Sequence, residues 1–177
     1  MTSSALRVWQ HSPAAFFESG FSRIAESRMQ GLPIVNPDVH VRAIGFDRYG
    51  NDWLGAVVTP WSILVVLACG NRSTWEHVPV TQERTVKLPS GDYRFMGMND
   101  PILGEYQSCS LMSPLIGIAD QQTAEAIAHQ ALTLMRQSDV ALPEAEEGQA
   151  LVPDPYIDPK PQKTRRSRRA FLFGDRG

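Results

Sequence analysis

Apolar residues recur at helical spacing in two segments of the chain, one near residue 20 and one near residue 128. The first segment starts where Ser12 can cap a helix and Pro13 fits its first position, and Gly31 closes it. The residues that share one face of this helix are Phe17, Phe21, Ile24 and Arg28. This spacing predicts an N-terminal helix whose apolar face packs on a core.

The second helical pattern begins near Asp120. Its apolar stripe consists of Ala124, Ile127, Ala128, Ala131, Leu134 and Met135. His129 lies on the polar side of the same helix by phase. We expect this helix to pack its stripe on a sheet.

Strand patterns fill the region between the two helices. Val39, Val41 and Ala43 alternate with polar neighbours, and residues 49–51 have turn composition. Residues 52–59 are apolar on both faces, which is typical of a strand in the interior of a sheet. Residues 61–69 are rich in Ile and Val and suit either a strand or a short helical turn after a proline.

Three more strand patterns follow. Residues 82–88 and 93–98 form a predicted hairpin around the turn at 89–92, and residues 99–101 have loop composition. A further strand covers 105–112 and ends at Ser113 and Pro114. The order predicts an α+β fold, in which an N-terminal and a C-terminal helix flank a mainly antiparallel sheet.

The last 39 residues differ from the rest in composition. Residues 139–159 contain six acids, four prolines and no Lys or Arg, a composition that predicts disorder. From Lys160 onward seven Lys and Arg residues face one acid, Asp175. We therefore divide the chain into a folded domain (1–138), an acidic linker (139–162) and a basic C-terminal segment (163–177), the last two forming a flexible tail.

Composition and charge narrow the class of protein. The 177 residues carry a net charge of −2, so the molecule as a whole is no electrostatic partner for nucleic acid. No continuous apolar region of a secretory signal occurs near the start. The longest apolar run, 63–69, is far shorter than the roughly 20 residues of a membrane-spanning helix. We expect a cytoplasmic protein without membrane insertion.

The sequence offers no catalytic or metal-binding pattern. Cys69 and Cys109 are 40 positions apart without a CxxC pair, and the four histidines lack metal-ligand spacing. The nucleophile, phosphate-binding and dinucleotide-binding motifs are absent. We expect a protein that is not an enzyme and has no cofactor or metal. A redox or metal-handling accessory role, and RNA binding through the basic tail, are the alternatives.

Three segments together resemble the HybE family of [NiFe]-hydrogenase assembly chaperones. They are WLGAVVTPW at 53–61, YQSCSLMSPL at 106–115 and RRAFLFG at 168–174. The resemblance implies a chaperone for maturation of an uptake [NiFe]-hydrogenase, which binds an immature large or small subunit before export by the twin-arginine pathway. Other hydrogenase maturation proteins are further expected partners.

Two groups of residues are candidates for partner binding. Trp61, Ser113, Pro114 and Leu115 follow the ends of predicted strands, where side chains often reach a surface, and tryptophan is a favoured anchor of interfaces. The second group, in the tail, is Arg168, Arg169, Phe171 and Phe173. That segment either docks on its own domain or mimics the signal peptide of a client.

Overall fold

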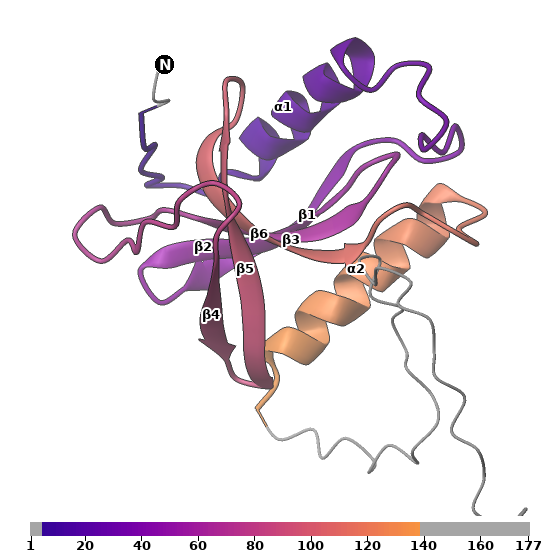
Figure 1. Ribbon diagram of the computed structural model, residues 1–177. Helices are drawn as coiled ribbons and strands as arrows, with labels where there is room; N and C mark the ends of the chain where they lie inside the picture. Colours follow the sequence, from indigo (N-terminus) through magenta and orange to yellow (C-terminus); the bar gives the residue numbers. More distant parts are fainter. Residues whose placement is uncertain (1–4, 139–177) are drawn as a thin grey trace, which may run out of the picture.

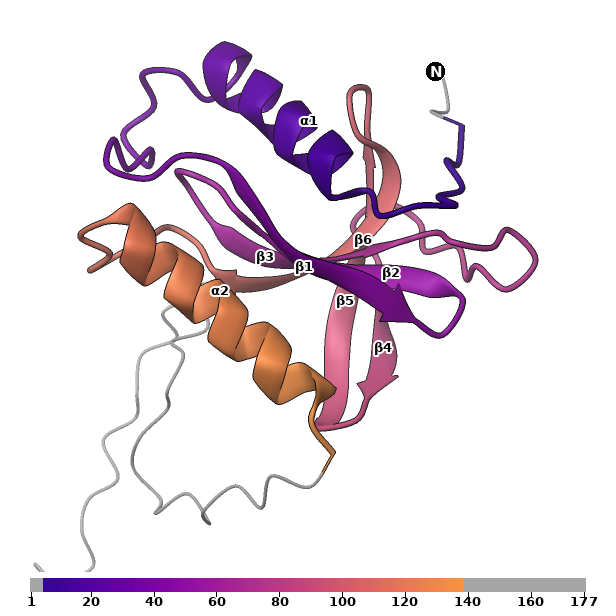
Figure 2. The same ribbon diagram turned by 180° about the vertical axis from the view of Figure 1, so that it is seen from behind.

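A six-stranded sheet separates two helices in the computed structural model, which describes residues 5–138 (Figures 1 and 2). Helix α1 (Ala14–Ser27) covers one face of the sheet and α2 (Gln121–Arg136) covers the other. The strands are β1 (Arg42–Tyr49), β2 (Asp52–Val58), β3 (Ile63–Ala68), β4 (Glu83–Leu88), β5 (Gly91–Asp100) and β6 (Gly104–Met112). Their order is β1-β2-β3-β6-β5-β4 with antiparallel neighbours, so the predicted α+β fold is confirmed.

The inner strands bury both faces because their side chains alternate between two apolar cores. On β2 and β3, Val57 and Val66 face α1 and pack with Phe17 and Phe21. Leu54 and Val65 point the other way and pack under α2. This alternation explains why the sequence of residues 52–59 is apolar throughout.

The sheet is strongly twisted, so that β4 and β5 run nearly across the direction of β1 and β2 (Figures 1 and 2). The twist brings the two edge strands close on one side. The hydroxyl of Tyr49, on β1, donates a hydrogen bond to the carbonyl oxygen of Lys87, on β4. Val86, Leu88 and Phe95 thereby join the core beneath α2.

A bulge in β1 fits the end of α2 to the sheet. The pairing of β1 with β2 shifts between Ile44 and Asp47, and Gly45 adopts a φ of 58°, which favours glycine. Arg136, at the end of α2, donates to the carbonyl oxygens of Gly45 and Leu54, both over 2.6 Å. The guanidinium thus supplies donors to carbonyl groups that the irregular ladder presents to it.

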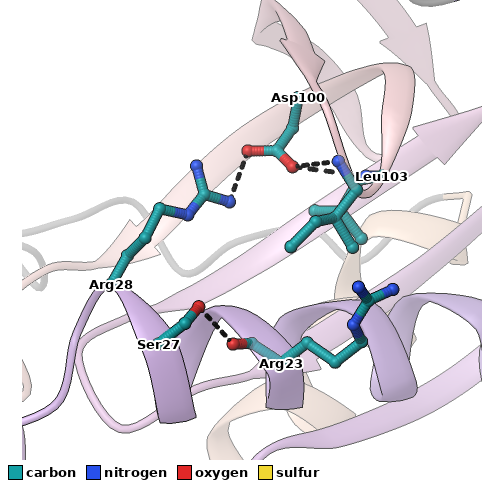
Figure 3. A network of polar contacts seen from close by, with 6 residues as sticks. Arg23, Ser27, Arg28, Asp100 and Leu103 are labelled. Carbon is teal, nitrogen blue, oxygen red and sulfur yellow. Dashed lines mark hydrogen bonds and ion pairs between the residues drawn. The ribbon is translucent and has the colours of Figure 1, made fainter.

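The helices differ from the predicted ones in two details, the end of α1 and the buried face of α2. Arg28 lies beyond α1, and its guanidinium pairs with Asp100 at the β5–β6 turn over 2.7 Å (Figure 3). On α2 the prediction for Leu134 was wrong: this side chain is 40% exposed, and Leu132 is 3% exposed in the core. Ala124, Ala128, Leu132 and Met135 follow the phase of the helix, and Leu134 lies off it.

Two strand predictions were also settled. The ambiguous residues 61–69 contain β3, a strand. Residues 99–101 were expected to be a loop, but β5 continues to Asp100 because Asn99 and Asp100 pair with Glu105 and Gly104. The predicted linker and basic segment lie outside the described residues.

Candidate functional site

The two turns that the sequence singled out lie at the same end of the sheet. Ile63 at the start of β3 pairs with Met112 at the end of β6. The turn that holds Trp61 therefore lies beside the turn that begins at Ser113, although Trp61 and Ser113 are 52 positions apart in sequence. Antiparallel pairing of β3 and β6 is the cause of this proximity.

The turn before β3 is held by the hydroxyl of Thr59. Its Oγ1 accepts a hydrogen bond from the backbone N–H of Ser62 over 2.9 Å and donates to the carbonyl oxygen of Ser62 over 2.9 Å. Thr59 and Ser62 are buried, and Trp61 is half-buried against the core on the α1 side. Trp61 thus has a packing role as well as an accessible part.

A third segment, the connection between α1 and β1, joins these two turns through Asn36. Its backbone N–H donates to the carbonyl oxygen of Pro60 over 2.7 Å. Its side-chain Nδ2 donates to the carbonyl oxygen of Ile118 over 2.9 Å, and its Oδ1 accepts from the N–H of Asp38. All three segments lie at one end of the sheet (Figures 1 and 2). Asn36 therefore fixes their relative positions.

An apolar groove of about 490 Å³ lies between the connection that contains Asn36 and the segment that follows Ser113. It is lined by residues 33–38, 114–116 and Ile118, and we call it the 34/116 groove. Ile34 is 48% exposed and Ile116 is 79% exposed, while Leu115 is buried at the base. Removing such side chains from water contributes a free energy of about 25 cal/mol per Å² of apolar surface. Burial of this surface by a partner is therefore favourable.

The two sequence segments that line the 34/116 groove carry negative charge. Asp38 is the one ionisable residue among the lining residues of this part of the described chain. Asp120 and Glu125 follow in the next residues, and neither 30–40 nor 113–126 contains Lys or Arg. The N–H and hydroxyl of Thr123 donate to the Asp120 carboxylate and lower its pKa from the ordinary value. The groove therefore suits an apolar ligand with positive charge.

The structure places the predicted partner-binding residues in different environments. Pro114 is exposed in the wall of the groove, after a cis peptide bond to the half-buried Ser113. Leu115 is buried in the α2-side core and lines the base. Trp61 is not part of the lining. Arg168, Arg169, Phe171 and Phe173 lie outside the described residues.

The sequence interpretation missed the opposite wall of the groove. Residues 32–37, LPIVNP, are apolar residues between prolines with neither helical nor strand spacing. An apolar run of that kind in a connection was an available signal of an exposed binding surface. Nothing in the sequence pairs this segment with residues 113–118, so the sequence alone does not identify it as a wall of a groove.

The cysteines and other titratable residues do not gather into a second site in the described chain. Both cysteines are free, with Cys69 buried and Cys109 half-buried. Among residues 5–138, no three His, Cys, Asp or Glu side chains lie close enough together to hold a metal ion. Within the same range, no helix is long and apolar enough to cross a membrane.

Comparison with known proteins decides the family. A family model for the [NiFe]-hydrogenase assembly chaperone HybE matches residues 12–174. The chain belongs to the HybE family. The match includes both walls of the 34/116 groove and the RRAFLFG segment.

Relatives of this HybE-family chain are similar over most of their length. It is 35% identical to Protein HoxT of Cupriavidus necator over 171 residues, or 90% of this chain and 87% of that protein. It is 37% identical to the hydrogenase expression/formation protein HoxT of Azotobacter vinelandii, over 70% of this chain and 77% of that protein. The solution structure of HybE from Escherichia coli matches with a TM-score of 0.60 and 27% identity, covering 100% of this chain and 98% of that one.

Proposed function

We propose that the protein is a non-enzymatic chaperone that binds an immature subunit of an uptake [NiFe]-hydrogenase before export, and that the 34/116 groove contacts this client. The observation that carries the proposal is the pair of exposed isoleucines, Ile34 and Ile116, on opposite walls of one groove. A monomeric soluble protein gains nothing from exposing both side chains to water.

Family membership supports the nature of the client. The chain belongs to a family of [NiFe]-hydrogenase assembly chaperones. An incompletely folded subunit exposes apolar segments that its own core will later bury. The groove would hold such a segment by burial of apolar surface, and release would need no covalent step. The proposed place of action is the cytoplasm, before translocation of the assembled hydrogenase.

Binding of purified precursors tests the proposal. We would titrate the full-length protein into the large-subunit precursor and, separately, into the small-subunit precursor by isothermal calorimetry. Wild type should bind one of them, and Ile116→Glu should weaken that binding by about tenfold or more, since a charge in an apolar interface lacks a partner.

The matched control is Leu134→Glu. Leu134 is exposed on α2 and does not line the groove, so this variant should bind like wild type. Circular dichroism should show both variants folded, because both side chains are exposed. Failure of both precursors to bind, or equal effects of the two glutamates, would contradict the proposal.

A further inference from the structure

We propose that residues 168–174 of the same chain, RRAFLFG, dock in the 34/116 groove when no client is present. The docking itself does not depend on the proposed function. Its effect on client binding does depend on it, and the two are measured separately below. The argument rests on reach, charge and apolar content.

The chain outside the described residues is long enough to return to the groove. Helix α2 begins three residues after Ile118, and its 16 residues carry the chain about 24 Å away from the groove at 1.5 Å per residue. Between Ser138 and Arg168 there are 29 further residues. A coil of that length has an end-to-end distance of roughly 30 Å. The distance to be covered therefore matches the length of the connection.

The charges of the segment and the groove are opposite. Asp38 lines the groove, and Asp120 and Glu125 lie within seven positions of the lining residue Ile118 in sequence. Neither 30–40 nor 113–126 contains Lys or Arg. The segment begins with Arg168 and Arg169. No salt bridge within the described residues uses Asp38 or Asp120. Both carboxylates are exposed and accessible to a cationic ligand.

The apolar residues of the segment suit the groove as well. Phe171, Leu172 and Phe173 follow the two arginines directly. Ile34 and Ile116 offer exposed apolar surface, and a groove of about 490 Å³ falls within the range of ordinary ligand sites. The family match continues to Gly174, so the matched range includes the segment.

Methyl NMR of the full-length chain tests the docking without any client. Aromatic rings that pack on Ile34 and Ile116 shift the resonances of these methyl groups. We expect Phe171→Ala/Phe173→Ala to move both resonances, and Tyr156→Ala, another aromatic of the tail, to leave them unchanged. All three residues lie outside the described domain, so the variants keep its core intact.

Two outcomes would overturn the proposal. Identical Ile34 and Ile116 resonances in wild type and the double variant would show that the segment does not dock there. Resonances of wild type that change with protein concentration would show docking on a second copy instead. A reciprocal test uses Asp38→Lys, which should release the segment and move the two methyl resonances toward those of the double variant.

The consequence for the client follows from competition. A tethered segment has an effective concentration on the order of 1 mM at its site. If its own Kd lies between about 0.1 and 1 mM, Phe171→Ala/Phe173→Ala should tighten client binding by about two- to tenfold. Weaker client binding in this variant would show that the segment builds the site and does not compete for it. Absence of any client binding would overturn the proposed function and leave the methyl result unaffected.

Discussion

The side-chain amide of Asn36 donates to the carbonyl oxygen of Ile118 over 2.9 Å, and this bond ties together the two walls of the 34/116 groove. The two residues are 82 positions apart. The backbone N–H of Asn36 also donates to the carbonyl oxygen of Pro60. One residue therefore connects both walls of the groove with the turn that holds Trp61.

Asn36→Asp removes the donor and keeps the shape. The new carboxylate still accepts from the N–H of Asp38, but it faces the carbonyl oxygen of Ile118 without a hydrogen. We expect a loss of about 1–3 kcal/mol in the free energy of unfolding at pH 7, measured by urea titration.

The control for this change is Asn71→Asp. Asn71 accepts from the N–H of Ser73 in the same local arrangement, and within the described residues its amide donates to no distant carbonyl. Its replacement should cost less than about 0.5 kcal/mol. Equal losses in the two variants would show that the bond to Ile118 is unimportant.

Asp100 makes the stability of the folded state depend on pH in the acidic range. Burial raises the pKa of its carboxyl, but hydrogen bonds from Arg28 and from the N–H groups of Ile102 and Leu103 outweigh this, so the pKa lies below 3.8 (Figure 3). At a pH between the lowered pKa of the folded state and the ordinary pKa of the unfolded state, the unfolded chain binds a proton that the folded chain does not. The contribution of Asp100 is therefore complete above about pH 4 and is lost as the pH falls through the folded pKa.

We expect Asp100→Asn to be less stable than wild type at pH 7 and the difference to shrink toward pH 2. Urea unfolding at several pH values measures it. Asp92→Asn, at an exposed position of β5, serves as the control for losing one negative charge. A difference between wild type and Asp100→Asn that stays constant with pH would contradict the prediction.

Gly55 leaves space for the ring of Phe46. A Cβ at Gly55 would lie 2.3 Å from two atoms of that ring, which stacks on Phe17 with 5.6 Å between centroids. We expect Gly55→Ala to cost about 1–3 kcal/mol in urea unfolding, since the ring must shift in a packed core. In a Phe46→Leu background the same change should cost less. An equal cost in both backgrounds would place the strain elsewhere.

The thiols should react slowly in the folded protein. Burial, together with the Asp52 carboxylate, raises the pKa of Cys69 to about 11, and burial also raises the pKa of Cys109. At pH 8, a thiol with a pKa of 11 has about a hundredfold less thiolate than one with the ordinary 9.0.

Mass spectrometry after iodoacetamide treatment at pH 8 measures this reactivity. We expect both cysteines to be modified rapidly in urea and slowly in buffer. The unfolded protein in urea is the control, because the same two thiols are compared in the unfolded and the folded state. Rapid modification of Cys109 in buffer would mean that its Sγ is accessible as a thiolate.

The elements of the fold could be predicted because each has a strong local pattern. The stripe that contains Phe17 and Ile24 and the doubly apolar strand 52–58 follow directly from residue spacing. The error at Leu134 arose because Leu132 and Leu134 both border the stripe, and only the sheet decides which of them is covered. Residues 61–69 were ambiguous, since an apolar run of that length suits strand and helix alike.

Only one wall of the groove, the one that contains Pro114, could be predicted from the sequence. Pro114 was identified because it follows a strand, whereas the wall that contains Ile34 has no regular spacing. Their meeting depends on the pairing of β3 with β6 and on Asn36, contacts between residues distant in sequence. A pattern along the chain carries no information on such contacts until the order of the strands is known.

The strand order also has a consequence for the route by which the chain folds. Strands β1, β2 and β3 pair as sequence neighbours, and so do β4, β5 and β6, so each half closes short loops. Within the described sheet, β3 with β6 is the pair that joins the halves, with Ile63 and Met112 49 positions apart. Contacts between distant residues form more slowly than local ones. Residues 33–38 belong to the first half and 114–118 to the second, so a nascent chain has no groove until the two halves have met.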